Sequence, residues 1–305
     1  MAIAESFAYS RVTTVGDYFA LLKPRVMSLV VFTGLAGIIV APGHVHPLTA
    51  FTALLCIAIA AGASGALNMA YDSDIDGLMT RTATRPIPLG HVAREEALAY
   101  GWALTALSVS MMWLFVNLLA ASLLAFTVFF YVVVYTLWLK RRTPQNIVIG
   151  GLAGALPPAI GWASVTGSLS LAPLVLVAII FVWTPPHFWA LSLWRSEDYA
   201  RAGIPMLPVV KGKPVTRRHI MAYTLLLVPL GVVPAFIGLG GMVYLVASAS
   251  MGFWMILEAF ATWRERDTVK EPAAKRLFAV SLLYIFVPFA ALIVERLLHI
   301  PPLWT

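Results

Sequence analysis

Five long stretches of the sequence carry almost no charge, and this pattern restricts how the chain can fold. Four of them contain no Asp, Glu, Lys or Arg: residues 26–71, 97–139, 143–194 and 277–294. The fifth, residues 219–263, contains only Glu258. A membrane-spanning helix needs about 20 apolar residues, so each of the four longest stretches suits two helices and the shortest suits one. The sequence therefore predicts an all-α polytopic membrane protein with nine transmembrane helices.

Each of the longer stretches is interrupted near its middle by residues that end helices or favour turns. The interruptions are Pro42-Gly43, the region of Asn117, Thr166-Gly167-Ser168, and residues 238–241. Only 11% of the residues are charged, compared with about 25% in soluble domains, so we expect no soluble domain. Residues 1–305 are expected to form a single transmembrane domain with two four-helix halves and a ninth helix.

The distribution of basic residues predicts which loops face the cytoplasm. Of the 21 Lys and Arg residues, all except Arg296 lie in or beside the N-terminal segment or in the loops after the even-numbered helices. By the positive-inside rule these loops are cytoplasmic, as is the N-terminal segment of about residues 1–22. The predicted cytoplasmic loops are residues 72–94, 140–145, 195–218 and 264–276. The net charge of +7 thus reflects topology and contact with the lipid bilayer, not nucleic-acid binding.

The N-terminal segment also bears on the location of the protein. Residues 1–22 contain Arg11 as their only basic residue, together with Glu5 and Asp17. They resemble neither a basic transit peptide nor a cleavable signal, so we expect a bacterial inner membrane.

Three polar residues at intervals of four mark the end of the second predicted helix. They are Asn68, Asp72 and Asp76, in the stretch NMAYDSDIDG. On a helix, steps of four residues keep side chains on one face and advance about 6 Å each, so the three form a stripe about 12 Å long. Asp74 would point away from it. Hard oxygen ligands at this spacing suit Mg²⁺, with waters and substrate phosphates completing the coordination. A solvated acidic loop is the alternative interpretation.

Two arginines follow these carboxylates directly. Arg81 and Arg85 lie in TRTATRPIPLG, and guanidinium groups bind phosphate oxygens in a bidentate manner. Carboxylates that hold a metal ion, followed by arginines, are typical of a diphosphate site. A plain Asp–Arg ion-pair cluster at the membrane surface is the alternative.

A second polar cluster occupies the corresponding place after the sixth predicted helix. His187 lies inside the span, about two turns from its cytoplasmic end, and Glu197 and Asp198 lie just beyond that end. Both halves therefore carry an acidic cluster at the same depth, and halves related in this way often form a site at their interface.

At these residues the sequence resembles a known family. The pattern N-x-x-x-D-x-x-x-D after the second span is the signature of the intramembrane prenyltransferases that act on aromatic acceptors. The stretches WTPPHFWALSLW and DYARAGIPMLP make the resemblance closest to the protohaem IX farnesyltransferase (haem O synthase) family. The resemblance extends over nearly the whole chain through the stretches LLKPRVMSLVVFTGLAG, NMAYDSDIDGLMTRTATRPIPLG and YTLWLKRRTPQNIVIGGLAGALPPAIGWASVTG.

The resemblance implies a helical bundle around a central cavity whose mouth is capped by cytoplasmic loops. It implies Mg²⁺ as cofactor, farnesyl diphosphate as donor and haem B as acceptor. The product would be haem O, which serves haem-copper terminal oxidases. A contact with haem A synthase is left open. So are two alternatives: a prenyltransferase for another acceptor such as 4-hydroxybenzoate, and a haem carrier or transporter.

The resemblance also assigns roles to residues. Asn68, Asp72 and Asp76 would hold metal and, with Arg81 and Arg85, form the catalytic diphosphate site. Many members of the wider superfamily have a second D-x-x-x-D, whereas here Glu197 and Asp198 are its nearest equivalent and the expected further metal ligands. The expected substrate contacts are Lys23, Arg25, Tyr135, Lys140, His187, Asp198 and Tyr199.

Two of these substrate contacts have a competing interpretation. Lys140 begins a run of three basic residues that also fits ordinary positive-inside charge. His187 is a candidate haem contact or iron ligand, because imidazole commonly binds haem iron. The alternative for His187 is a packing role, with the ring bonded to a backbone carbonyl freed by Pro185 or Pro186.

Overall fold

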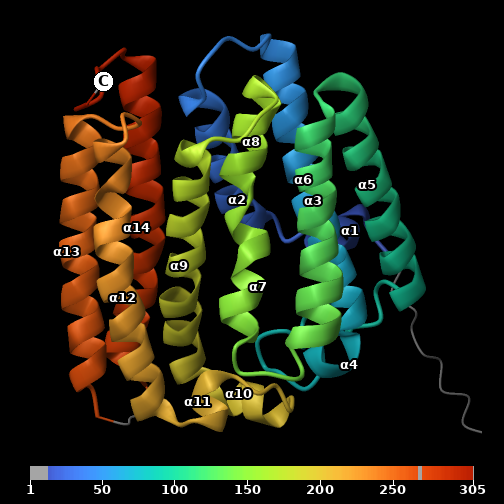
Figure 1. Cartoon of the computed structure of the whole chain (residues 1–305). Coiled ribbons are helices and arrows are strands. Elements are labelled where there is room, and N and C mark those ends of the chain that lie inside the picture. The colour runs from blue at the N-terminus through green and yellow to red at the C-terminus, as the bar shows by residue number, and fades with distance from the viewer. Residues whose placement is uncertain (1–12, 267–269, 305) are drawn as a thin grey trace, which may run out of the picture.

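In the computed structural model, residues 13–266 and 270–304 are described, and every regular element within these ranges is helical. The long helices stand side by side between two ends of the molecule (Figure 1). The elements that make up the spans after the first are α3 (Pro47–Tyr71), α5 (Arg94–Phe115), α6 (Leu118–Phe129) with η1 (Phe130–Leu139), α7 (Asn146–Ala155) with α8 (Pro157–Thr166), α9 (Leu171–Trp194), α12 (Lys213–Phe236), α13 (Met242–Arg264) and α14 (Pro272–Leu297).

The first span is bent near its start. α1 (Val15–Leu21) and α2 (Pro24–Val40) meet at 53°, and together they are long and apolar enough to cross a membrane. Within the described ranges there are eight further spans, so the bent pair makes nine. The all-α fold with nine transmembrane helices is therefore confirmed. Part of the N-terminal segment predicted at residues 1–22 is helical, and residues 1–12 lie outside the described residues.

The helices end where the sequence predicted interruptions. α2 stops two residues before Pro42. Asn117 caps α6 by accepting a hydrogen bond of 2.8 Å from the backbone N–H of Ala120. Gly167 follows α8 with a φ of 65°, a left-handed conformation that glycine adopts without strain. Local capping chemistry thus sets these boundaries.

Glycines allow α2 and α8 to cross at backbone contact. A Cβ atom on Gly37 would lie 2.1 Å from the carbonyl oxygen of Pro158, and one on Gly161 would lie 2.2 Å from that of Gly34. In lipid the hydrophobic effect does not favour association of helices, so close van der Waals packing at small residues helps to hold them together. This crossing fixes the first span against the fifth.

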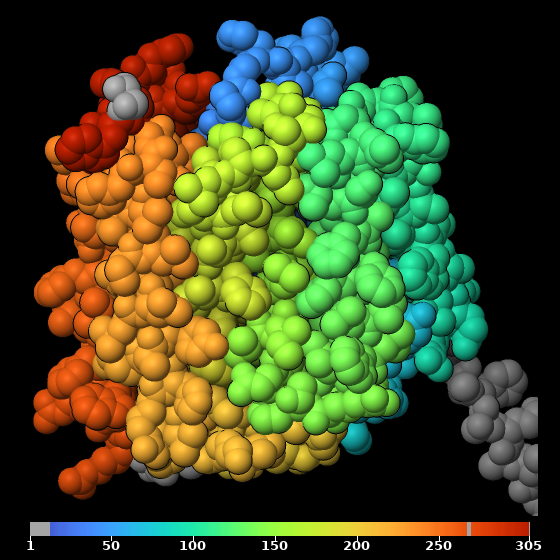
Figure 2. All heavy atoms as spheres, viewed as in Figure 1, coloured from blue at the N-terminus to red at the C-terminus, as the bar shows by residue number. Residues whose placement is uncertain are grey.

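The polar connections gather at one end of the bundle. Figure 1 shows α4 (Ser73–Asp76), α10 (Ser196–Arg201) and α11 (Leu207–Val210) at the same end as the connection from η1 to α7. Around the bundle, large apolar side chains such as Phe115 and Phe253 are exposed, as lipid contact requires. Side chains of neighbouring helices meet over the face seen in Figure 2. The chain is a polytopic membrane protein.

Candidate functional site

The acidic stripe lies where α3 ends. Asp72 leaves the helical conformation with φ −97° and ψ 7°, so the helix that was expected to continue is interrupted there. The backbone N–H of Asp72 still donates to the carbonyl of Asn68 at 3.0 Å, and that of Asp76 donates to the carbonyl of Asp72 at 2.8 Å. These bonds keep the four-residue periodicity through the break. Asn68, Asp72 and Asp76 are all nearly inaccessible, with exposures of 4%, 0% and 2%.

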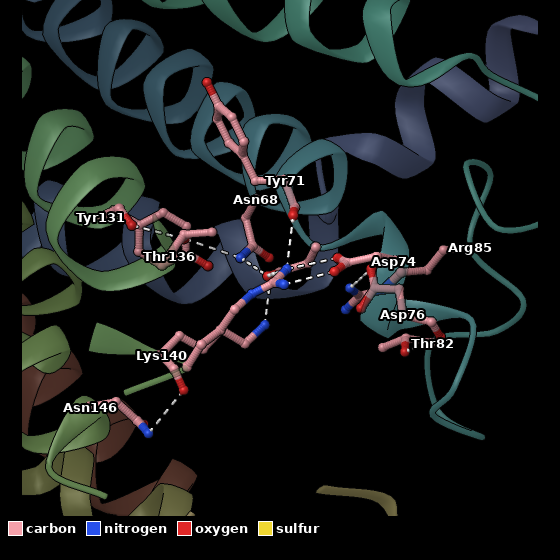
Figure 3. Close-up of polar contacts among 12 residues, drawn as sticks. Asn68, Tyr71, Asp74, Asp76, Thr82, Arg85, Tyr131, Thr136, Lys140 and Asn146 are labelled. Carbon is pink, nitrogen blue, oxygen red and sulfur yellow. Dashed lines mark hydrogen bonds and ion pairs between the residues drawn. The ribbon is translucent and has the colours of Figure 1, made fainter. Parts of the chain in front are cut away.

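Two lysines from other segments reach this stripe. The Nζ of Lys140 donates to Oδ2 of Asp72 at 2.5 Å, and the Nζ of Lys23 donates to Oδ1 of Asn68 at 2.6 Å. Asn68 in turn donates to Oδ2 of Asp72 at 2.6 Å and to the hydroxyl of Thr136 at 3.2 Å (Figure 3). Three spans therefore contribute to one polar network at the cytoplasmic end predicted from the basic residues.

Asp76 of the stripe and the neighbouring Asp74 differ in their surroundings. Asp76 accepts a bond of 2.6 Å from Nη1 of Arg85. Asp74 is exposed and accepts two bonds of 2.7 Å from Arg141, and this hydrogen bonding lowers the pKa of the Asp74 carboxyl. Asp74 thus points away from the stripe, as expected from the spacing.

The second acidic cluster contacts the loop after the stripe through a threonine. Asp198 is buried on α10, and its Oδ1 accepts a bond of 3.0 Å from the hydroxyl of Thr80. Arg201 also contacts this Oδ1 and donates to the Thr80 hydroxyl at 2.8 Å. The neighbouring Glu197 is exposed. The structure therefore brings Asp198 to the loop that follows the stripe and leaves Glu197 at the surface.

A π-helix supplies the aromatic side of the site. In η1, the hydroxyl of Thr136 donates to the carbonyl of Tyr131 at 2.9 Å, and the rings of Tyr131 and Tyr135 lie 5.5 Å apart. The wider turn places Thr136 toward Asn68, and π-helical segments are frequent at functional sites. Gly150 makes room for this arrangement, because a Cβ atom there would lie 2.2 Å from the Tyr135 ring.

Tyr199 and Arg81 lie together beside Asp198. Tyr199 is buried in an apolar cluster that also contains Ile75 and Tyr135. Burial, the larger effect, raises the pKa of the Tyr199 phenol, while the adjacent Arg81 acts in the opposite direction. Arg81 is exposed, as is Arg25 at the start of α2. Neither arginine forms an ion pair with a carboxylate within residues 13–266 and 270–304, and Arg81 interacts with the Tyr199 phenol.

The carboxylates have the properties of ligands for a hard divalent cation. Asp72 Oδ1 and Asp198 Oδ2 are buried and accept no hydrogen bond from the described residues. The nearest guanidinium nitrogens, of Arg141 and Arg195, lie 3.6 and 3.5 Å away. Buried oxygens without donors suit Mg²⁺. Among the described residues, no group of three His, Cys, Asp or Glu side chains is close enough together to hold a metal ion. A metal ion bound here would therefore also need amide, water or substrate oxygens as ligands.

His187 lies elsewhere, between α9 and α14. Its ring is 6% exposed and stacks with the rings of Trp183 and Phe278, each at a centroid distance of 4.4 Å. Its Nδ1 lies 2.6 Å from the hydroxyl oxygen of Ser281. The alternative of a bond to a backbone carbonyl near the two prolines is not observed.

Sequence reasoning missed four polar residues that complete these contacts: Thr80, Thr136, Arg201 and Ser281. Thr80, Thr136 and Arg201 fall inside stretches that carry the family resemblance, so a signal for them was present. Ser281 stands in an apolar span with no local motif, and only its contact with His187 reveals it.

The chain is similar to known prenyltransferases in sequence. The UbiA prenyltransferase family matches residues 30–283. A protein of Parvibaculum lavamentivorans named "Protoheme IX farnesyltransferase" is 61% identical over 92% of this chain and 89% of its own length. A protein of Azorhizobium caulinodans with the same name is 59% identical over 93% of this chain and 92% of its own length.

Solved structures are similar in fold. A digeranylgeranylglyceryl phosphate synthase aligns with a TM-score of 0.74 and 17% identity, over 92% of this chain and 99% of the other. A UbiA homolog from Archaeoglobus fulgidus, bound to DMAPP and Mg²⁺, aligns with a TM-score of 0.65 and 18% identity, over 90% of this chain and 99% of the other. With the sequence matches, these findings show that the chain belongs to the UbiA prenyltransferase family, together with the protohaem IX farnesyltransferases.

Proposed function

We propose that this chain transfers the farnesyl group of farnesyl diphosphate to a vinyl group of haem B, with addition of water, to form haem O. The observation that carries the proposal is the 61% identity to a protein named for this activity, in a chain with a buried stripe of Asn68, Asp72 and Asp76. Identity at that level, over most of both chains, favours haem over 4-hydroxybenzoate as the acceptor.

The stripe and its cations would bind the diphosphate of the donor. Asn68, Asp72, Asp76 and Asp198 are the residues we expect to hold Mg²⁺, in keeping with the Archaeoglobus homolog bound to DMAPP and Mg²⁺. When bound, the metal would act as a Lewis acid toward the leaving diphosphate. Lys23, Lys140, Arg81 and Arg85 are placed to add positive charge there, which lowers the barrier to ionisation. The expected diphosphate contacts also include Arg25, at the edge of the site.

The transfer breaks the C1–O bond of the donor, the π bond of the vinyl group and one O–H bond of water, and it forms one C–C bond and one C–O bond. The C1–O bond of farnesyl diphosphate ionises, and C1 bonds to the terminal carbon of the vinyl group. The cation left next to the porphyrin ring is captured by water, which then loses a proton to give the hydroxyl. Tyr131, Tyr135 and Tyr199 offer ring faces that would stabilise cations, and the apolar cluster around Tyr135 and Tyr199 would keep water from the first cation.

The distribution of charge supports an orientation in the membrane. We infer a bacterial inner membrane with a cytoplasmic N-terminus, which places the diphosphate site on the side where soluble farnesyl diphosphate is made available. A handover of product to haem A synthase stays a prediction, which copurification of the two proteins would check.

One experiment tests the function. Purified protein is incubated with haem B, farnesyl diphosphate and Mg²⁺, and the haem fraction is then analysed by mass spectrometry together with released diphosphate. We expect a haem that has gained one farnesyl group and one water, with stoichiometric diphosphate. Prenylation of 4-hydroxybenzoate in place of haem, or haem binding without diphosphate release, would reject the proposal in favour of the other acceptor or of a haem carrier.

A further inference from the structure

Two contacts of Ser281 favour one tautomer of His187. The hydroxyl of Ser281 is placed to donate to the backbone carbonyl of Phe278 at 2.6 Å, and its oxygen also lies 2.6 Å from Nδ1 of His187. A carbonyl can only accept, and a serine hydroxyl has one hydrogen. When that hydrogen is donated to Phe278, Nδ1 of His187 carries a proton and donates it to Ser281.

This tautomer leaves the other ring nitrogen as a free electron-pair donor. A neutral imidazole with its proton on Nδ1 has a lone pair on Nε2. The Nε2 of His187 forms no hydrogen bond to any residue within 13–266 or 270–304, although the residue is more than nine-tenths buried. A ring nitrogen left without a partner, on a side chain buried to this degree, points to a ligand.

The surroundings also hold the ring in one orientation. Trp183 and Phe278 stack with the imidazole at interplanar angles of 20° and 22°, which prevents the ring from turning about its own axis. Trp183 is itself fixed, because its Nε1 donates to the carbonyl of Ser281 at 2.6 Å. Histidines that bind metals characteristically donate their second N–H to a carbonyl, carboxylate or similar acceptor, which sets the tautomer and the ring orientation.

We propose that Nε2 of His187 binds the iron of the acceptor haem as an axial ligand, and that Ser281 is the positioning residue that holds the imidazole in the required tautomer. This inference rests on the proposed function, since it takes haem as the acceptor. It gives His187 a role in holding the acceptor and none in the diphosphate site, which is built from α3, its following loop and η1.

Iron-free porphyrin separates coordination from packing. Full-length protein is titrated with haem B and, separately, with protoporphyrin IX, which has the same ring and no iron. In the wild type we expect the absorption and resonance Raman signatures of histidine-ligated haem. In His187→Ala, haem binding should weaken by at least 10-fold and those signatures should disappear, while protoporphyrin IX binding changes less than 2-fold. Added imidazole should restore the ligated spectrum in His187→Ala.

Two further variants complete the test. Ser281→Ala should keep the iron–histidine bond but shift its stretching frequency and weaken haem binding by about 10-fold, the lower end of the range for losing such a partner. His219→Ala is the matched control, because His219 also donates from Nδ1, to the Val215 carbonyl at 2.9 Å, but lies on α12. It should leave the haem spectrum unchanged.

The outcomes are distinct. An unchanged haem spectrum in folded His187→Ala, or an equal loss of haem and protoporphyrin IX binding, overturns the ligand role and leaves His187 as a packing residue. Haem O formation by the wild type is measured in parallel. If the wild type forms haem O and the spectrum does not depend on His187, only this inference fails. If the wild type binds haem and forms no haem O, the proposed function fails instead.

Discussion

The Nζ atom of Lys140 lies 2.5 Å from Oδ2 of Asp72, and this contact joins the ends of the second and fourth spans. Asp72 is completely buried, and a buried carboxylate without a neutralising partner is costly. Lys140 supplies the opposite charge in the protein without substrate. Lys140 would also lie beside a diphosphate bound near Asp72, so we expect this one lysine to serve both stability and donor binding.

Loss of the Asp72 charge should abolish most of the transferase activity. Asp72→Asn keeps the shape of the side chain and removes its charge, so we expect haem O formation to fall by about two to three orders of magnitude, as for other losses of one electrostatic contact in a transition state. Activity is measured across a Mg²⁺ titration. Asp74→Asn is the control and should stay within a few-fold of wild type, because Asp74 points away from the stripe. Equal effects of the two changes would contradict the assignment.

Removal of Lys140 should affect both folding and donor binding. Lys140→Met leaves Asp72 buried with Arg141 3.6 Å away as its remaining cation, so we expect a loss of up to about 3–5 kcal/mol in stability. Thermal unfolding in detergent measures this, and titration with a non-hydrolysable farnesyl diphosphate analogue measures binding. The neighbouring Arg142 is exposed, and Arg142→Met should change neither quantity appreciably.

A methyl group at Gly150 should disturb the aromatic side of the site. Gly150→Ala places a Cβ atom 2.2 Å from the Tyr135 ring, and overpacking of this kind costs about 1–3 kcal/mol. Gly154→Ala, four residues along α7, meets no atom within 4 Å and should be neutral or slightly stabilising. Thermal unfolding compares the two. Activity should fall only in Gly150→Ala. A loss of activity in both variants would indicate that any added methyl group on α7 is harmful, whether or not it contacts Tyr135.

Reporter fusions should reveal opposite sides for the two kinds of loop. A phosphatase fused after residue 43 should be active, because that loop lies at the end opposite the basic loops, and one fused after residue 212 should be inactive. A cytoplasmic reporter at the same positions is the control and should give the reverse pattern. Matching signals at residues 43 and 212 would refute the nine-span topology.

The sequence by itself determined the spans and the position of the stripe. Hydrocarbon excludes charge and unsatisfied backbone groups, so apolar length dictates helices, and local residues such as Asn117 and Gly167 dictate where they end. The spacing of Asn68, Asp72 and Asp76 survives the break in the helix because backbone hydrogen bonds still link residues four apart. These features depend on interactions between residues close in sequence.

Only the tertiary structure decided which side chains meet. Glu197 and Asp198 are neighbours in the sequence, yet one is exposed and the other buried, because consecutive residues of a short helix face different directions. Lys23 reaches Asn68 across 45 residues, Lys140 reaches Asp72 across 68, and His187 reaches Ser281 across 94. Such pairs depend on how the spans pack together, and the crossing of α2 and α8 at glycines shows that this packing depends on shape. A pattern within a single span carries no information about the shape of its neighbour.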